Sequence, residues 1–221
     1  MKMLSPQTLW VGVVAVLLSA CGGEPGQQET TTETEPAPAA QPVCHYSYDG
    51  ATTKAFWTAY KHTARVEVKG TFDSLTVMQD KSVEYPQEVL NGATFSIYTS
   101  SVNSSDADRD KKIVEKFFGT MAGGDVLTGT VNGVEGGLDS GRVNISLNMN
   151  GTSQDFGGTY TIKGEELSLR AHIEFDHWNA QDAVDALQAA CSERHTGTDG
   201  VSKFWPEGEI LVKTTLVKTC D

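Results

Sequence analysis

The chain has 221 residues, 38% of them hydrophobic, and carries a formal net charge of −12. Without its N-terminal segment about 200 residues remain, enough for one domain with a hydrophobic core. The charge excludes nucleic acid as a partner, because binding to phosphates requires clustered Lys and Arg. It also argues against electrostatic docking on anionic lipid.

The N-terminal segment has the layout of a secretory signal. Lys2 precedes an apolar run over residues 9–18, and small residues then lead to Cys21. The run is too short to span a bilayer, which needs about 20 apolar residues. Small residues followed by a cysteine resemble a bacterial lipoprotein signal, which implies a signal peptide over residues 1–20 and acyl groups on Cys21. An ordinary signal peptide with a chance cysteine is the alternative.

Residues 21–43 are predicted to be the lipidated cysteine and a disordered tether. The stretch 22–43 has four acidic residues, no basic ones and almost nothing apolar to bury. A docking motif for a partner is the alternative reading of its composition. Acylated Cys21 would hold the domain at a membrane surface. Gly22, rather than Asp, implies by the same resemblance the outer membrane, with the domain facing the periplasm.

Alternation of apolar and polar residues dominates the predicted domain, residues 44–221. It runs through residues 56–72, 142–150, 156–162, 167–175 and 210–216, with Asn-Gly and Gly-Gly turns between segments. The pattern predicts about eight or nine half-buried strands joined by hairpins, and therefore an antiparallel barrel or sandwich.

Two short helices are expected to interrupt the strands. The first begins with a Ser105 cap and acidic residues in its opening turn, and its apolar stripe includes Phe117 and Phe118. The second is capped by Asn179 and has an apolar face that ends at Cys191. We expect the first helix to plug one end of the barrel and the second to pack on its outside.

Three cysteines remain once Cys21 carries lipid, and an oxidising compartment favours one disulfide among them. Cys44 opens the first expected strand and Cys220 closes the last. These strands would pair in a closed antiparallel barrel, so we predict a Cys44–Cys220 disulfide and a buried thiol at Cys191. Pairing of Cys191 with one of the other two is the alternative.

Several motifs in this domain resemble the YceI-like family. They are Ala55–His62, Val66–Phe72, Phe95–Asn103, Arg109-Asp110 and Phe117-Phe118, and their order and spacing carry the resemblance over residues 44–218. The resemblance implies an all-β fold, a lipocalin-like antiparallel β-barrel of about eight strands with two short helices. It also implies an internal pocket for a long apolar chain, such as a polyisoprenoid or a quinone tail.

The expected pocket is formed by inward-facing apolar rows and the paired phenylalanines, with Tyr60, His62 and Tyr160 placed to hydrogen-bond a head group at one mouth. The candidate ligand-binding residues are Phe56, Tyr60, His62, Val66, Val68, Phe72, Phe95, Ile97, Phe117, Phe118, Val143, Ile145, Leu147, Phe156, Tyr160, Leu169, Ile173 and Phe175. A solid core without a pocket would need the same apolar rows, so alternation leaves that alternative open.

No constellation in the sequence supports catalysis or a cofactor other than a bound lipid. His62 and Tyr60 are the clear titratable candidates in the inward rows, without a carboxylate or nucleophile at a recognisable spacing. The row of His172, Glu174 and Asp176 faces outward, so we expect a solvated face rather than a metal site.

The sequence therefore predicts a lipid-anchored binding protein for a long-chain apolar lipid. The competing hypothesis is a structural lipoprotein with a filled barrel, in which exposed Phe204 and Trp205 contact a partner. The sequence gives no basis for an oligomeric state.

Overall fold

A computed structural model describes residues 42–221 of the chain. The predicted signal peptide, the lipidation of Cys21 and all but the last two residues of the tether lie outside the described residues. In the described part, no helix is both long and apolar enough to cross a membrane.

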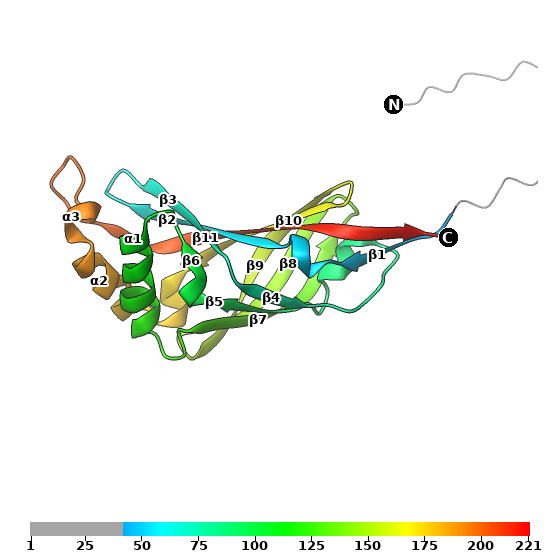
Figure 1. Cartoon of the computed structure of the whole chain (residues 1–221), viewed down its shortest axis with the longest axis horizontal. Coiled ribbons are helices and arrows are strands. Elements are labelled where there is room, and N and C mark those ends of the chain that lie inside the picture. The colour runs from blue at the N-terminus through cyan, green and yellow to red at the C-terminus, as the bar shows by residue number, and fades with distance from the viewer. Residues whose placement is uncertain (1–41) are drawn as a thin grey trace, which may run out of the picture. The chain divides into compact units, whose positions relative to one another are not determined.

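The architecture is a strongly curled antiparallel sheet with short helices gathered at one end (Figure 1). The strand order is β4-β5-β7-β8-β9-β10-β11-β2-β3-β6, and β1 pairs with β11. The strands are β1 (Cys44–Tyr48), β2 (Lys54–Lys61), β3 (Val66–Phe72), β4 (Leu75–Met78), β5 (Thr94–Tyr98), β6 (Val102–Asn103), β7 (Val126–Gly136), β8 (Ser140–Met149), β9 (Thr152–Lys163), β10 (Glu166–Glu174) and β11 (Phe204–Cys220).

The mostly β, antiparallel fold was predicted correctly, but the closed barrel of about eight strands was not. The sheet has eleven strands, and its path ends at β4 and β6 without pairing between these two strands. The additional strands include β4, with four residues, and β6, with two. Segments of two to four residues contain too few alternating positions for a reliable strand prediction.

The residues of β2 that face inward are the odd-numbered ones, Ala55 and Trp57, whereas an even-numbered residue, Phe56, had been expected to face inward. Ala55 pairs with Phe72, and Trp57 pairs with Gly70 across the β2–β3 hairpin. Directly opposed residues share a face of the sheet, so the inward row changes from odd numbers in β2 to even numbers in β3. The prediction that Phe56 faces inward was wrong because it assumed that even-numbered residues face inward in both strands of the hairpin.

Trp57 occupies the inner position that had been given to Phe56. Its indole Nε1 donates to the carbonyl of Thr71 at 3.1 Å. The ring lies over Gly70, where an added Cβ would stand 2.4 Å from both the Trp57 ring and the Asn103 carbonyl oxygen. Glycine at this position therefore allows the indole to lie flat against β3.

The first helical segment begins one residue later than expected. Helix α1 (Ala107–Lys112) is capped by Asp106, whose carboxylate accepts from the Arg109 amide at 3.0 Å. Ser105 is not the cap, because its φ of 63° places it in the left-handed region before the helix. The chain continues through a π-helical turn, η4 (Ile113–Phe117), and a 3₁₀ turn, η5 (Phe118–Thr120).

The second helical segment covers the same end of the sheet as the first, rather than the outside (Figure 1). Helix α2 (Gln181–Ala190) packs against η4 and β11, and α3 (Ser192–His195) follows it. Leu187 lies in the same buried cluster as Phe117 and Phe118. Asn179 is not the N-cap of α2; it ends η6 (Phe175–Trp178) in the left-handed conformation, and Ala180 takes the cap position.

The remaining 3₁₀ turns are η1 (Gly50–Thr52), η2 (Pro86–Leu90) and η3 (Thr99–Ser101). The expected Cys44–Cys220 disulfide is present, and the two residues are register partners of β1 and β11. Cys191 is a buried free thiol, as predicted. The disulfide lies at the end of the sheet opposite the helices (Figure 1).

Removal of the disulfide should destabilise the domain. The bond joins residues 176 positions apart. In the chain-entropy model, closing so long a loop contributes roughly 5 kcal/mol to the free energy of unfolding. In denaturant unfolding, a Cys44→Ala/Cys220→Ala variant should lose several kcal/mol of the free energy of unfolding. Cys191→Ala leaves the disulfide intact and should therefore retain its contribution. A double variant as stable as the parent would contradict this role.

Gly70→Ala should destabilise the domain by about 1–3 kcal/mol, the usual cost of overpacking. The new methyl group must displace the Trp57 ring or the backbone at Asn103. Gly157→Ala is the matched control, because nothing lies within 4 Å of the added Cβ in β9. Chemical denaturation measures both variants, and equal stability changes would show that Gly70 has no special packing role.

Candidate ligand-binding cavity

The curled sheet encloses an elongated apolar cavity of about 260 Å³. Its wall includes side chains of β2, β3, β4, β5, β7, β8, β9, β10 and β11, and the helical segments line one end. Many of the residues expected from the sequence line it: Tyr60, Val68, Phe72, Phe95, Ile97, Phe117, Phe118, Ile145, Leu147, Phe156, Leu169, Ile173 and Phe175.

The space remains open because several inward positions carry small side chains. Ala59 of β2 faces Gly208 of β11, and Ala171 of β10 lies between Gly158 and Ile210. The small residues therefore leave space in the interior of the sheet. The alternative left open by the sequence was a core filled by side chains.

Three predicted lining residues lie elsewhere because of their strand positions. Phe56 is on the outer face of β2, beside Lys213 of β11. Val66 is 43% exposed at the start of β3. His62 belongs to the β2–β3 turn, and its Nε2 lies 3.1 Å from the carbonyl oxygen of Arg194. None of the three lines the cavity.

Two further predicted residues are buried beyond the cavity wall. Val143 and Tyr160 belong to a second hydrophobic cluster, and neither lines the cavity. The Tyr160 hydroxyl donates to the carbonyl of Gly137 at 2.6 Å, which occupies its donor. Tyr60 does contact the cavity, but its hydroxyl donates to Glu209 on the outer face at 3.0 Å. Neither tyrosine hydroxyl is therefore placed for a head group.

Several lining residues were not predicted from the sequence. Trp57 was missed because the row in β2 was reversed, and Leu187 and Cys191 were missed because α2 was assigned to the outside. The apolar stripe of α2 was itself a usable signal, since it required an apolar partner surface. Ile113 and Phe204 also line the cavity, and their positions depend on contacts between distant segments.

An aromatic cluster closes the helical end of the cavity. The Phe117 ring lies 5.0 Å from Phe175 and 5.1 Å from Phe118, measured between centroids, and both contacts are edge-on. Phe204 is buried in the same cluster and stacks against His195 at 5.6 Å. These contacts correct the expectation that Phe204 is an exposed partner contact.

Trp205 also packs against the domain. The Arg65 guanidinium lies 4.7 Å from its ring centroid, and the Lys203 ammonium lies 4.2 Å away. Its indole Nε1 donates to the carbonyl of His62 at 2.8 Å. The aromatic pair therefore stabilises the helical end of the sheet and offers no free apolar surface.

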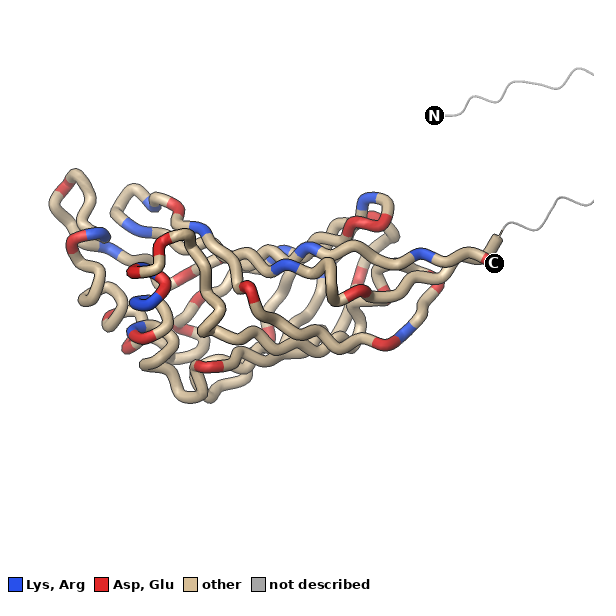
Figure 2. Tube along the Cα trace, viewed as in Figure 1, with Lys and Arg blue, Asp and Glu red and all other residues tan. Residues whose placement is uncertain are grey.

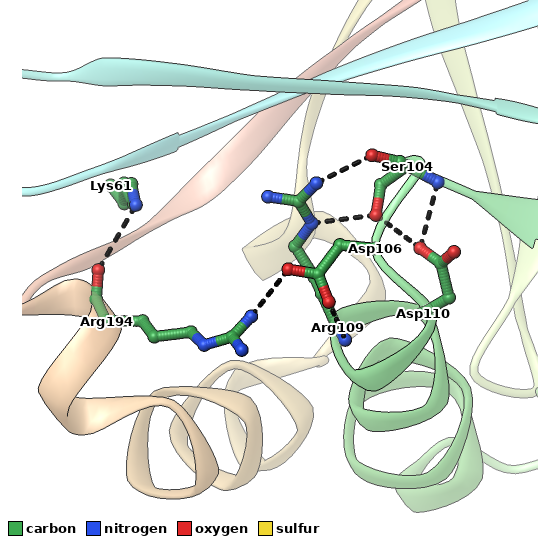
Figure 3. Close-up of polar contacts among 6 residues, drawn as sticks. All are labelled: Lys61, Ser104, Asp106, Arg109, Asp110 and Arg194. Atoms are coloured by element: carbon green, nitrogen blue, oxygen red, sulfur yellow. Dashed lines mark hydrogen bonds and ion pairs between the residues drawn. The ribbon is translucent and has the colours of Figure 1, made fainter.

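The cationic side chains of the lining, Lys61, Arg109 and Arg194, lie at the helical end together with His195. Figure 3 shows the two arginines approaching from the two helical segments, with Asp106 between them. His195 is buried, and its Nδ1 has no hydrogen-bond partner in the structure described. Burial, with the nearby charges of Lys61, lowers the pKa of His195 to about 4, so the imidazole is neutral near pH 7.

The outward row of β10 contacts β11. His172 lies 3.4 Å from a carboxylate oxygen of Glu207. In residues 42–221, no three His, Cys, Asp or Glu side chains lie close enough to share a metal ion.

Comparisons with known structures identify the same fold in three bacterial proteins. Burkholderia cenocepacia BcnA has a TM-score of 0.53 and 13% identity, covering 78% of this chain and 99% of its own. A polyisoprenoid binding domain from Saccharophagus degradans has a TM-score of 0.51 and 15% identity, covering 79% of this chain and 99% of its own. The Campylobacter jejuni YceI protein has a TM-score of 0.50 and 20% identity, covering 73% of this chain and 89% of its own.

No curated protein sequence matches this chain. The family model described as the YceI-like domain matches residues 46–199, more than half of the chain. That span includes the motifs that suggested the family, together with most of the strands that enclose the cavity. The chain belongs to the YceI-like family.

Proposed function

We propose that this protein is a lipid-anchored carrier or sequestering protein that holds the long apolar chain of a lipid inside the curled sheet. The observation that carries the proposal is the apolar cavity, whose wall comes almost entirely from hydrophobic side chains. The polyisoprenoid binding domain with the same fold supports the same ligand class.

Burial of the chain supplies the binding free energy. Each methylene transferred from water to an apolar site contributes about 0.8 kcal/mol, and an extended chain has many of them. The elongated space between β2, β10 and β11 suits an alkyl or prenyl chain better than a compact polar molecule. A polyisoprenoid or quinone tail meets both requirements.

The lining favours binding over catalysis. The lining includes Cys191 and His195, a nucleophile type and a base type, and His195 Nδ1 makes no hydrogen bond within the described residues. An activated nucleophile needs its base within hydrogen-bond reach. We therefore propose a holding role for the cavity.

The anchor is proposed from the sequence signal at Cys21. In the described part, residues 42 and 43 lead into β1, which begins at the disulfide, at the end opposite the helices. A tether attached there leaves the helical end of the cavity on the far side of the domain from the attachment point. The outer membrane facing the periplasm remains our proposed location.

Ala171→Phe should strongly weaken lipid binding without unfolding the domain. Ala171 faces the cavity at mid-strand in β10, so a phenyl ring would occupy the space of the chain. Arg170→Phe is the matched control, because the neighbouring residue is exposed on the outer face. We expect affinity for geranylgeraniol to fall at least about tenfold in the first variant alone.

Fluorescence titration with the prenol measures both affinities, and circular dichroism checks that both variants fold. Equal binding by Ala171→Phe and the parent would place the lipid outside this cavity and overturn the proposal.

A further inference from the structure

The charges at the cavity wall differ from those of the whole protein. The chain has a formal net charge of −12, yet the lining contains Lys61, Arg109 and Arg194 against one acid, Glu209. Glu209 is exposed, and its carboxylate accepts from Tyr60 on the outer face. Figure 2 shows acidic and basic residues intermingled at the helical end, so the outer surface there is not uniformly basic. The excess of cations is a property of the lining.

Arg109 is held rigidly by neutral groups. Its Nε donates to the Ser104 hydroxyl and its Nη2 to the Ser104 carbonyl, both at 2.7 Å. Asp110 fixes Ser104 in turn, accepting from its amide at 2.9 Å and from its hydroxyl. No carboxylate oxygen lies within 4.0 Å of the guanidinium nitrogens in residues 42–221. Arg109 is thus a half-buried, preorganised cation with Nη1 free to donate.

Arg194 and Lys61 reach this end of the cavity from α3 and β2, and Figure 3 shows Lys61 at the Arg194 backbone carbonyl while the Arg194 side chain extends toward Asp106. Arg194 Nη1 donates to Asp106 at 2.8 Å, and the other oxygen of that carboxylate caps α1. Lys61 Nζ donates to the Arg194 carbonyl at 3.3 Å. An ammonium has three donors, so Lys61 keeps two for another acceptor.

His195 adds a second, independent indication of a ligand. It is only 9% exposed, it lines the cavity, and its buried Nδ1 has no partner among the described residues. A buried polar atom without a partner costs free energy, which a ligand that hydrogen-bonds to it would recover. Because the imidazole is neutral, it adds no fourth positive charge to the wall.

We propose that the cavity takes an amphiphile whose apolar chain carries an anionic head group, bound by Arg109, Arg194 and Lys61 with His195 as a hydrogen-bond partner. This inference rests on the proposed function and names the ligand class more narrowly. A phosphate, diphosphate or carboxylate provides acceptor oxygens for the guanidinium and ammonium donors. A neutral alcohol would leave most of these donors without a partner.

The test compares ligands that share one chain and differ in the head group. The probes are geranylgeraniol, geranylgeranyl phosphate, geranylgeranyl diphosphate and geranylgeranoic acid. The protein is the full chain carrying Cys21→Ala, which removes the proposed acylation site. We expect one of the anions to bind at least about tenfold tighter than the alcohol. Comparison of the two phosphates with the acid shows which anion the site prefers.

Variants locate the head group. Arg109→Gln should lower the anion-to-alcohol affinity ratio about tenfold, and Arg194→Gln, at a more exposed position, should lower it in the same direction. Lys203→Gln is the matched control, because this cation stacks on Trp205 at the same end without lining the cavity. Higher salt should lower the ratio as well.

The outcomes separate this inference from the function on which it rests. If all four ligands bind with similar affinity and the ratio is insensitive to Arg109 and Arg194, the head-group site is wrong and the apolar cavity role stands. If none of the four ligands binds, both are overturned. If Arg109→Gln does not fold, the ratio in Arg194→Gln and the salt dependence decide the question.

Discussion

The pairing of β11 with three other strands is the constraint on which the rest of the structure depends. This strand of 17 residues pairs with β10 along one edge, and with β2 and then β1 along the other. Its register decides which residues of β2 and β10 face inward, and it places Ala59, Gly208 and Ala171 in the cavity wall. One end of β11 is fixed by the Cys44–Cys220 disulfide, and the other places Phe204 in the aromatic cluster.

The ends of the cavity differ in chemistry because the sheet is covered differently at each end. At the helical end, α1, η4, α2 and α3 bring aromatic rings, two arginines and a buried histidine to one place. Along the sheet, the wall is mainly apolar and accepts a chain largely without directional contacts. An apolar body with a polar end is the complement of an amphiphile, and this match connects the fold to the proposed ligand.

Much of the fold could be predicted from the sequence because each long strand has one wet face and one buried face. Leu169, Ile173, Ile145 and Leu147 were placed correctly inside, since alternation within one strand is a local property. The inward row of β2 could not be transferred from β3, because parity across a hairpin depends on the pairing register, which alternation within either strand does not define. Phe56 and Trp57 exchanged roles for this reason alone.

The polar part of the site was beyond local reasoning. Arg109 belongs to a recognised motif, but its free donors follow from the way Ser104 and Asp110 fold around it. His195 and Lys61 are more than 130 residues apart, and only the placement of α3 beside the end of β2 brings them together. The cysteine pairing was accessible, in contrast, because the antiparallel meeting of the first and last strands constrained it.

Mass spectrometry of the protein purified without denaturants from the cells that produce it, with an organic extract examined beside it, tests the central claim most directly. The account predicts one long-chain lipid per protein chain, released into the extract and absent from the Ala171→Phe variant. A protein that carries no lipid, and takes up no added prenyl lipid, would contradict the claim that the curled sheet is built around a ligand.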